Sequence, residues 1–473
     1  MTTPTTLLAL ALSLAIAGPG SGVALAADAL PGDLPPYGAD RPLPVPDITR
    51  RTLANGLEVW VVPRDGIPRV DYVLAVRNAG FAVDAPATPG FASLFASLLP
   101  EGTGRRDSRA IAEAAQGHGG SVSASASTDG VIVTADALAP HAAPMLALLA
   151  EVVRTPAFPE EEVALGRANA LQALKAAEAQ PAFKATRALR RAIYGAHPYA
   201  RTQQTEASIE GVTAAVLRAE HARRFQPDRA LLVITGRIAP DEALRLAEST
   251  FGDWTAAGTE VPATPPVPAD ATPRRVLVQR DGSVQSTIRL GSPAIAATGD
   301  DYVPLQLAGT VLGGSFSSRV MQNLREQKGY TYGASTTLVA ARMGGHVQGG
   351  ADVRNEVTGA SLKEFFGEFE RLGSGPVPAT ELDDTKRYVA GSYLIGNQMQ
   401  GAVAATLASQ WLAGLPAEFL GQYVPKIRAV DAAQVQAMAR KYYDPARQSI
   451  VVVGDGAAIA DQLAPYGEFS RAE

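Results

Sequence analysis

The amino-acid sequence predicts an α+β protein of two duplicated domains, each of which combines strands and helices. Three observations lead to this fold class. A Pro-rich run, residues 261–273, divides the chain into two parts of similar length. Residues 212–236 match residues 430–454 without a gap. Strand-like and helix-like segments recur in the same order in both parts, and a repeat this long indicates domain duplication.

The gapless repeat contains a helix, a turn and a strand in both copies. Each helix follows a good N-cap, Thr213 or Asp431, and continues as an Ala-rich amphipathic run. A Pro-containing turn comes next, and then a strand rich in β-branched residues that ends at Gly236 or Gly454. Both domains are therefore expected to contain the same helix–strand unit.

Other segments of the two parts correspond more loosely. Two neighbouring strands and one long helix of the first part each have a counterpart in the second, and we expect the two strands to pair with each other. The matched segments are 57–62 with 276–279, 70–77 with 286–290, and the helix 140–155 with 357–372. The expected boundaries are 47–258 for the N-terminal domain, 259–273 for the linker and 274–473 for the C-terminal domain.

The start of the chain has the pattern of a secretory signal peptide. Residues 7–17 form an apolar run too short to cross a bilayer comfortably, and residues 24–26, Ala-Leu-Ala, fit an A-x-A cleavage site. No Lys or Arg precedes the run, so a buried or disordered N-terminal segment is the alternative. We expect a signal peptide at 1–26, a Pro-rich extension at 27–46, and no membrane span after signal removal. The mature protein would then be exported, and periplasmic in a Gram-negative bacterium.

Composition excludes several classes of function. The 473-residue chain has a net charge of −5 and no conspicuous basic block, which gives no reason to expect nucleic acid as a partner. It contains no cysteine, and this excludes disulfides, thiol catalysis and Cys-ligated metal. No P-loop or dinucleotide-binding fingerprint is present. We expect a soluble globular protein long enough for two hydrophobic cores.

Several runs resemble the family of pitrilysin, insulin-degrading enzyme and mitochondrial processing peptidase, the inverted-zincin metallopeptidases. They follow the family's order along nearly all of the mature chain: NGLEVWVVP at 55–63, PGFASLFASLLPEGT at 89–103, HPYARTQQTEASIEGVT at 197–213, FQPDRALLVITG at 225–236 and GGSFSSRVMQNLREQKGYTYGA at 313–334. The single pair of domains resembles the small bacterial two-subunit branch, in which each such chain forms half of a clamshell. The resemblance implies that each domain has a mixed, mostly antiparallel sheet covered by helices. The resemblance implies peptide substrates, held in a chamber by strand addition to an exposed sheet edge.

The family's zinc positions hold residues that cannot bind zinc. In the family, two His one helical turn apart bind Zn²⁺, and a Glu beside them activates the metal-bound water. These positions fall on Ser93, Ala96 and Ser97, the downstream Glu ligand falls on Ala173, and a supporting acidic position falls on Gly166. The resemblance therefore implies a chain with no catalytic residues and no metal of its own, and Zn is expected in a partner subunit.

The family's substrate-holding pair is retained. In active relatives an Arg and a Tyr hydrogen-bond the peptide near the scissile carbonyl, and these correspond to Arg325 and Tyr332 in LREQKGYTY. A guanidinium and a phenol hydroxyl are good donors to a carbonyl oxygen that gains negative charge. By residue type alone, however, Arg325 is an ordinary helix charge and Tyr332 an ordinary strand aromatic. Tyr330 replaces the usual Leu and competes for the assignment.

Other candidate residues have simpler explanations. Ser93 and Ser97 have no neighbouring His or Lys in the sequence that would activate a nucleophile, so we expect them to be small helix-packing residues. The run GGSVSASAS at 119–127 predicts an edge strand, which in the family pairs with substrate. Three glutamates at 160–162 start a helix, where negative charge complements the helix dipole.

Three hypotheses about function remain. In the first, the chain is the non-catalytic, substrate-binding subunit of an exported heteromeric zinc metallopeptidase, and a homologous subunit carries an intact His-x-x-Glu-His motif. In the second, it is a stand-alone pseudopeptidase that binds peptides or acts as a scaffold. The third, an active hydrolase with unconventional ligands, has the least support in the sequence.

Overall fold

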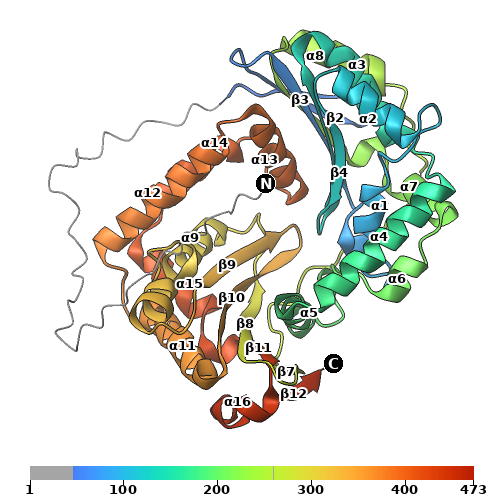
Figure 1. Cartoon of the computed structure of the whole chain (residues 1–473). Coiled ribbons are helices and arrows are strands. Elements are labelled where there is room, and N and C mark those ends of the chain that lie inside the picture. Colours follow the sequence, from blue (N-terminus) through green and yellow to red (C-terminus); the bar gives the residue numbers. More distant parts are fainter. Residues whose placement is uncertain (1–45, 259, 473) are drawn as a thin grey trace, which may run out of the picture. The chain divides into compact units, whose positions relative to one another are not determined.

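Two six-stranded sheets form the framework of the part of the chain that the structure describes, residues 46–258 and 260–472 (Figure 1). The structure is a computed structural model. The expected signal peptide and all but the last residue of the Pro-rich extension lie outside the described residues. Within the described ranges, no helix combines the length and the apolar character needed to cross a membrane.

The first sheet lies in the N-terminal half and has the strand order β1-β2-β6-β3-β5-β4. Neighbouring strands are antiparallel except for β2 and β6, which are parallel. The strands are β1 (Thr49–Thr52), β2 (Glu58–Pro63), β3 (Arg69–Arg77), β4 (Val122–Ala126), β5 (Gly130–Leu138) and β6 (Ala230–Gly236).

The second sheet has the order β12-β7-β11-β8-β10-β9, with β7 parallel to both of its neighbours. The strands are β7 (Arg275–Gln279), β8 (Gln285–Ala294), β9 (Ala334–Ala341), β10 (Gly344–Arg354), β11 (Ser449–Gly454) and β12 (Ser470–Ala472). Five positions of this sheet repeat the order of the first, and only the outermost strand, β1 or β12, comes from a different place in its half. The prediction of two duplicated α+β domains is confirmed.

One expectation about the strands is wrong. β2 and β3 are not hydrogen-bonded to each other, because β6 lies between them, and β11 separates β7 from β8 in the same way. Every residue of β6 and of β11 is buried. A strand that is apolar on both faces is stabilised most at the centre of a sheet, where other elements cover both faces. This burial outweighs the pairing of strands that are neighbours in the sequence.

Helices pack around both sheets. In the N-terminal half they are α1 (Phe91–Ser97), α2 (Ser108–Gly117), α3 (Ala142–Arg154), α4 (Glu160–Glu178), α5 (Pro181–Tyr194), α6 (Glu206–Glu210), α7 (Ala214–Arg224) and α8 (Pro240–Phe251). In the C-terminal half they are α9 (Tyr302–Gly313), α10 (Arg319–Met321), the π-helical segment η5 (Gln322–Gln327), α11 (Thr358–Ser374), α12 (Ala379–Gly396), α13 (Gln400–Leu412), α14 (Phe419–Ala429), α15 (Ala432–Tyr442) and α16 (Gly456–Leu463).

The predicted helix–strand repeat is confirmed by α7 with β6 and α15 with β11. The two N-caps act as expected: the Thr213 side chain accepts a hydrogen bond from the Val216 N–H, and the Asp431 side chain accepts one from the Gln434 N–H. Each cap satisfies a donor that the first helical turn would otherwise leave without a partner.

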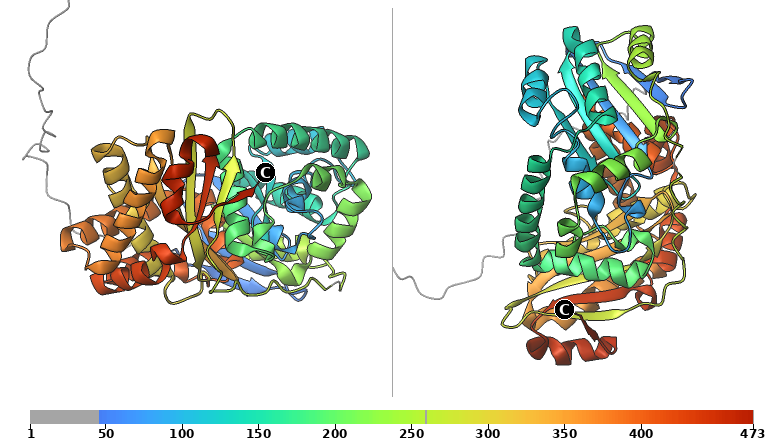
Figure 2. Two further views of the ribbon diagram at one scale, coloured as in Figure 1. Left: turned by 90° about the horizontal axis from the view of Figure 1, so that it is seen from below. Right: turned by 90° about the vertical axis from the view of Figure 1, so that its right-hand side faces the viewer.

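Each sheet is covered on one face by a helix from the other half of the chain. α13 packs on β3 and β6 of the first sheet, whereas α5 packs on β8 and β11 of the second (Figures 1 and 2). Trp411 of α13 joins Trp60 of β2 in one buried cluster, and Leu189 of α5 joins Val451 of β11 in another. The two halves thus share their cores through an exchange of helices.

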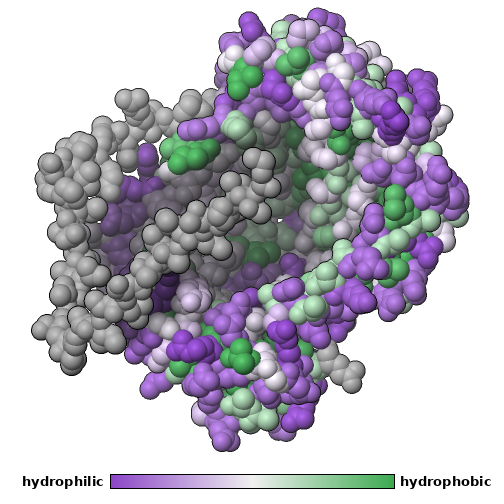
Figure 3. Space-filling model, viewed as in Figure 1, coloured by the Kyte–Doolittle hydropathy of each residue, from purple (hydrophilic) through white to green (hydrophobic). Residues whose placement is uncertain are grey.

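The surface in Figure 3 is mostly hydrophilic, with scattered hydrophobic side chains. Exposed large hydrophobic residues among those described include Val284, Phe316, Tyr332 and Met399. Single exposed hydrophobic residues are common on soluble proteins, so hydropathy alone does not mark a site here.

Candidate functional site

The short helix α1 carries three of the vacant zinc positions. It follows Gly90, whose φ of 71° is a left-handed conformation that favours glycine. Ser93 and Ser97 share the exposed face, and Ser97 Oγ donates a hydrogen bond to the Leu94 carbonyl at 3.0 Å. The helix-packing role expected for the two serines is therefore wrong. Ala96 lies beside them on the helix but is fully buried in the core of the first half.

Helix α4 carries the remaining vacant positions and packs against α1. Ala173 is exposed. At Gly166 a Cβ atom would lie 2.9 Å from Leu98 Cδ2 and 3.4 Å from Leu94 Cδ1, so a longer side chain requires Leu98 to move. The described residues contain no group of three or more His, Cys, Asp or Glu side chains that could hold a metal. Two hydroxyls and two methyl groups do not fit a zinc ion.

Strand β4, the expected edge strand, has a sheet neighbour on one side only, β5. Its side chains alternate between partly buried and exposed, and Ser123 Oγ lies 2.8 Å from Thr134 Oγ1 on β5. α1 packs beside it. Helix α1, which would carry the zinc ligands in an active relative, therefore packs against the strand at the open edge of the first sheet.

Arg325 lies in η5, and its side chain is about one-third exposed. Its guanidinium carbon lies 4.5 Å from the centre of the Phe316 ring, and its Nε lies 3.4 Å from Glu326 Oε1. Phe316 is itself 60% exposed. Cation–π stacking therefore restrains the Arg325 side chain without using most of its hydrogen-bond donors.

The π-helical turn that carries Arg325 is joined to α11 through the buried side-chain amide of Asn323. Asn323 Nδ2 donates to Glu364 Oε2 at 2.9 Å and to Glu368 Oε1 at 2.7 Å, both on α11. Arg371 pairs with Glu368, and Lys328 Nζ lies 3.5 Å from Glu364 Oε1. π-Helical turns are rare and often occur at functional sites.

Tyr332 follows this turn and is 94% exposed. Thr331 fixes the loop between η5 and Tyr332, because its Oγ1 donates a hydrogen bond to the Asp352 carbonyl at 2.8 Å. Arg325 and Tyr332 line the same surface pocket of about 350 Å³, together with Tyr330. The structure thus brings the predicted pair together. Ser93, Ala96, Ser97 and Ala173 do not line this pocket.

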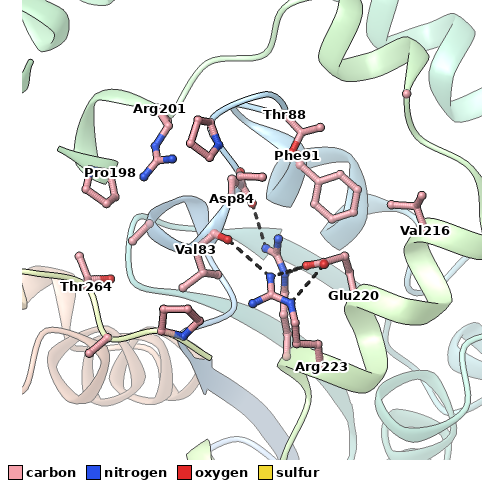
Figure 4. A pocket seen from close by; sticks show the side chains of 17 residues that line it. Val83, Asp84, Thr88, Phe91, Pro198, Arg201, Val216, Glu220, Arg223 and Thr264 are labelled. Carbon is pink, nitrogen blue, oxygen red and sulfur yellow. Dashed lines mark hydrogen bonds and ion pairs between the residues drawn. The ribbon is translucent and has the colours of Figure 1, made fainter. Parts of the chain in front are cut away.

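The sequence did not predict a second pocket, which lies in the N-terminal half and is shown in Figure 4. Arg224, only 1% exposed, donates through Nη1 to Asp84 Oδ1 and to the Ala79 carbonyl, each at 2.9 Å. Burial raises the pKa of Asp84 to about 6, although the Arg224 guanidinium and a backbone N–H lower it. In the sequence, Arg224 is an ordinary cation in the last turn of a helix, so no pattern marks this pair.

Comparisons with families and relatives agree with the geometry. Residues 69–205 match the model described as insulinase (peptidase family M16), and residues 211–389 match the one described as peptidase M16 inactive domain. The chain is 24% identical over 403 residues to the uncharacterized zinc protease YmxG of Bacillus subtilis, covering 84% of this chain and 96% of that protein. It is 23% identical to the non-peptidase homolog YmxG of Helicobacter pylori, covering 76% and 83%.

Solved structures show the same fold. A peptidase M16 inactive domain from Pseudomonas fluorescens superposes with a TM-score of 0.81 at 26% identity, covering 86% of this chain and 98% of that one. A protease from Helicobacter pylori superposes with a TM-score of 0.82 at 20% identity, covering 87% and 100%.

Proposed function

Because this chain belongs to peptidase family M16 and its zinc positions hold Ser and Ala, we propose that it is a non-catalytic, substrate-binding subunit of an exported heteromeric zinc metallopeptidase. The substrates are peptides or unfolded protein segments. A homologous partner with an intact His-x-x-Glu-His motif supplies the zinc, the water and the base. Export rests on the signal-peptide pattern of residues 1–26.

One observation carries this proposal. Arg325 and Tyr332 border one solvent-accessible pocket, whereas none of the zinc positions keeps a ligand. A copy that had decayed without a role would have lost both sets of residues. Retention of the donors alone fits a chain that presents them to a peptide bound beside another chain's metal.

The donors suit a backbone carbonyl. A stacked guanidinium and an exposed phenol can both donate to one oxygen, and such bonds strengthen as the oxygen gains negative charge. The open edge of β4 offers a further row of backbone donors and acceptors to an extended peptide. This chain therefore contributes binding and orientation, and the partner contributes the bond-breaking chemistry.

The test is reconstitution with a zinc-bearing M16 homologue from the same source. We expect the mixture to cleave an unfolded or fluorogenic peptide that this chain alone leaves intact. Arg325→Ala should lower kcat/KM of the pair by about 100-fold, and Tyr332→Phe by about tenfold, because each removes a donor to the reacting carbonyl. The matched control is Arg280→Ala, which removes an exposed cation from the same half.

Unchanged cleavage in both Arg325→Ala and Tyr332→Phe would rule out the assigned role. Cleavage by the isolated chain, abolished by a chelator, would show that the chain binds its own metal. The alternative function is a stand-alone peptide-binding or scaffold protein. Its one support is that both candidate peptide-binding features, the β4 edge and the Arg325 pocket, lie in this one chain. It predicts peptide capture by a homodimer with no partner present.

A further inference from the structure

The pocket of Figure 4 contains five charged side chains, and four of them satisfy one another. Asp84 accepts from Arg224 through Oδ1 and from the Ala92 N–H through Oδ2 at 3.1 Å. Glu220 accepts from Arg223 through both oxygens, at 3.1 and 2.6 Å, and from Arg224 Nε at 2.7 Å. Burial alone would raise the pKa of Glu220, but these hydrogen bonds hold it below its usual value.

The fifth charged residue, Arg201, has no partner among the other four. Among the residues that the structure describes, its side chain has no hydrogen bond or ion pair, and its Nε is buried without a partner. Figure 4 shows the Arg201 side chain at the pocket wall between Pro198 and Asp84, with no interaction drawn to it. A buried guanidinium nitrogen without an acceptor is unfavourable, and the carboxylates of the pocket are already occupied.

The rest of the lining is largely apolar. Ala82, Val83, Pro86, Phe91, Pro198 and Val216 contribute to it, and the interdomain linker supplies one wall through residues 262–264. The volume is about 450 Å³, enough for a small organic body with one charged group. Apolar walls with a single uncompensated cation select a ligand with one anionic end and an apolar remainder.

We propose that this pocket binds a monocarboxylate with an apolar body, and that Arg201 anchors the carboxylate. A guanidinium fits a carboxylate through two parallel N–H···O bonds, which gives both affinity and orientation. The apolar body then replaces water against Phe91 and the prolines of the wall. This site is separate from the Arg325 pocket and does not depend on the subunit role proposed above.

Two sources supply this chemistry, a free carboxylic acid and the C-terminus of an apolar peptide, and two pairs of probes distinguish them. One pair is octanoate and octanamide. The other is an acetylated alanyl-alanyl-leucine tripeptide with a free carboxyl terminus and the same peptide with a terminal amide. Binding to the purified full chain is measured by calorimetry and by ligand-observed NMR at millimolar concentration. We expect at least one acid to bind about tenfold or more tightly than its amide, about 1.4 kcal/mol.

The variants are Arg201→Ala and, as the matched control, Arg245→Ala, an exposed arginine of α8 in the same half. Because the Arg201 side chain makes no hydrogen bond to any described residue, its loss should leave the thermal unfolding midpoint nearly unchanged while it removes the preference for the acid. Arg245→Ala should keep that preference. The proposal is overturned if neither acid binds, if acids and amides bind equally, or if Arg201→Ala retains the preference.

Discussion

At the residue scale, the vacant zinc positions are of two kinds. Ser93 and Ser97 lie on the exposed face of α1, so larger side chains there meet solvent. Ala96 is fully buried and packs in the core of the first half. At the position where active relatives carry the catalytic Glu, this chain therefore has a buried core residue, and restoring one residue at a time should not create a metal site.

Ala96→Glu should destabilise the protein by at least about 3 kcal/mol, because it places an unpaired carboxylate in an apolar core. The matched control is Ser97→Glu, one residue later on the exposed face, which should change the free energy of unfolding by about 0.5 kcal/mol or less. Urea denaturation of both variants measures the difference. Equal stability of the two would mean that α1 does not pack as described.

The sequence could identify these positions but not their surroundings. Motif register was enough to place Ser93, Ala96 and Ser97 on one helix. It did not say which face of a seven-residue helix would be buried, because apolar residues occur around most of it. The pair of Asp84 and Arg224 was missed for a related reason, since burial of a helix-end cation depends on tertiary packing.

At the element scale, η5 presents Arg325 because Asn323 ties the π-helical turn to α11. Asn323 is 5% exposed, and its Oδ1 has no hydrogen-bond partner among the described residues. A site that leaves a buried acceptor unsatisfied stores a small unfavourable energy, which is tolerated when the turn has a function. We propose that Asn323 is a positioning residue for Arg325.

Asn323→Ala should lower the free energy of unfolding by about 1–3 kcal/mol, because Glu364 and Glu368 lose their shared donor. At a temperature where the variant is fully folded, peptide cleavage by the reconstituted pair should also fall, by about tenfold. Gln327→Ala, at an exposed position of the same segment, is the control and should change neither quantity. A variant that is destabilised but cleaves normally would leave Asn323 a purely structural role.

The sequence predicted where the strands lie along the chain but not their order in the sheets. Alternation and β-branched runs predicted the positions of β2, β3, β7 and β8 to within a few residues. They did not predict that β6 and β11 enter between these pairs, because local patterns describe a strand and not its neighbours. The available signal in the sequence was the nearly continuous apolar run of both segments, ALLVITG and SIVVVG, since strands that are apolar on both faces belong at the centre of a sheet.

At the scale of the whole molecule, the exchange of α5 and α13 joins the two halves. Amphipathic patterns show that one face of each helix is buried but not which sheet covers it. The contacts are specific: the Arg77 guanidinium of β3 lies 3.5 Å from the centre of the Trp411 ring of α13, and Trp411 Nε1 donates to Glu58 Oε1 at 3.1 Å. The interface between the halves is therefore part of the folded core.

The α5 contact contains a histidine that should make this interface sensitive to acid. Tyr194 at the end of α5 lies with its hydroxyl 2.7 Å from His346 Nδ1 on β10. Burial is the main cause that lowers the pKa of His346, the nearby Arg190 cation lowers it as well, and the resulting pKa is about 3. Both effects keep the imidazole neutral. Its Nδ1 can then accept a hydrogen bond from the tyrosine hydroxyl, while its Nε2 donates one to Gln348 Oε1 at 3.4 Å.

The sign of the pH effect follows from these values. Unfolded His346 has its ordinary pKa of about 6.5, so below that pH the unfolded chain binds a proton that the folded protein excludes. Stability from this residue is complete above about pH 6.5 and is lost as the pH falls towards 3, by about 2 kcal/mol at pH 5.

His346→Gln keeps an acceptor for Tyr194 but cannot titrate, so it should lose about 2 kcal/mol less than the wild type between pH 7.5 and pH 5. Tyr194→Phe removes the hydrogen bond but keeps the buried imidazole, and it should retain the wild-type pH dependence. Urea denaturation at the two pH values measures all three proteins, and parallel losses in wild type and His346→Gln would show that this contact between the halves does not sense acid.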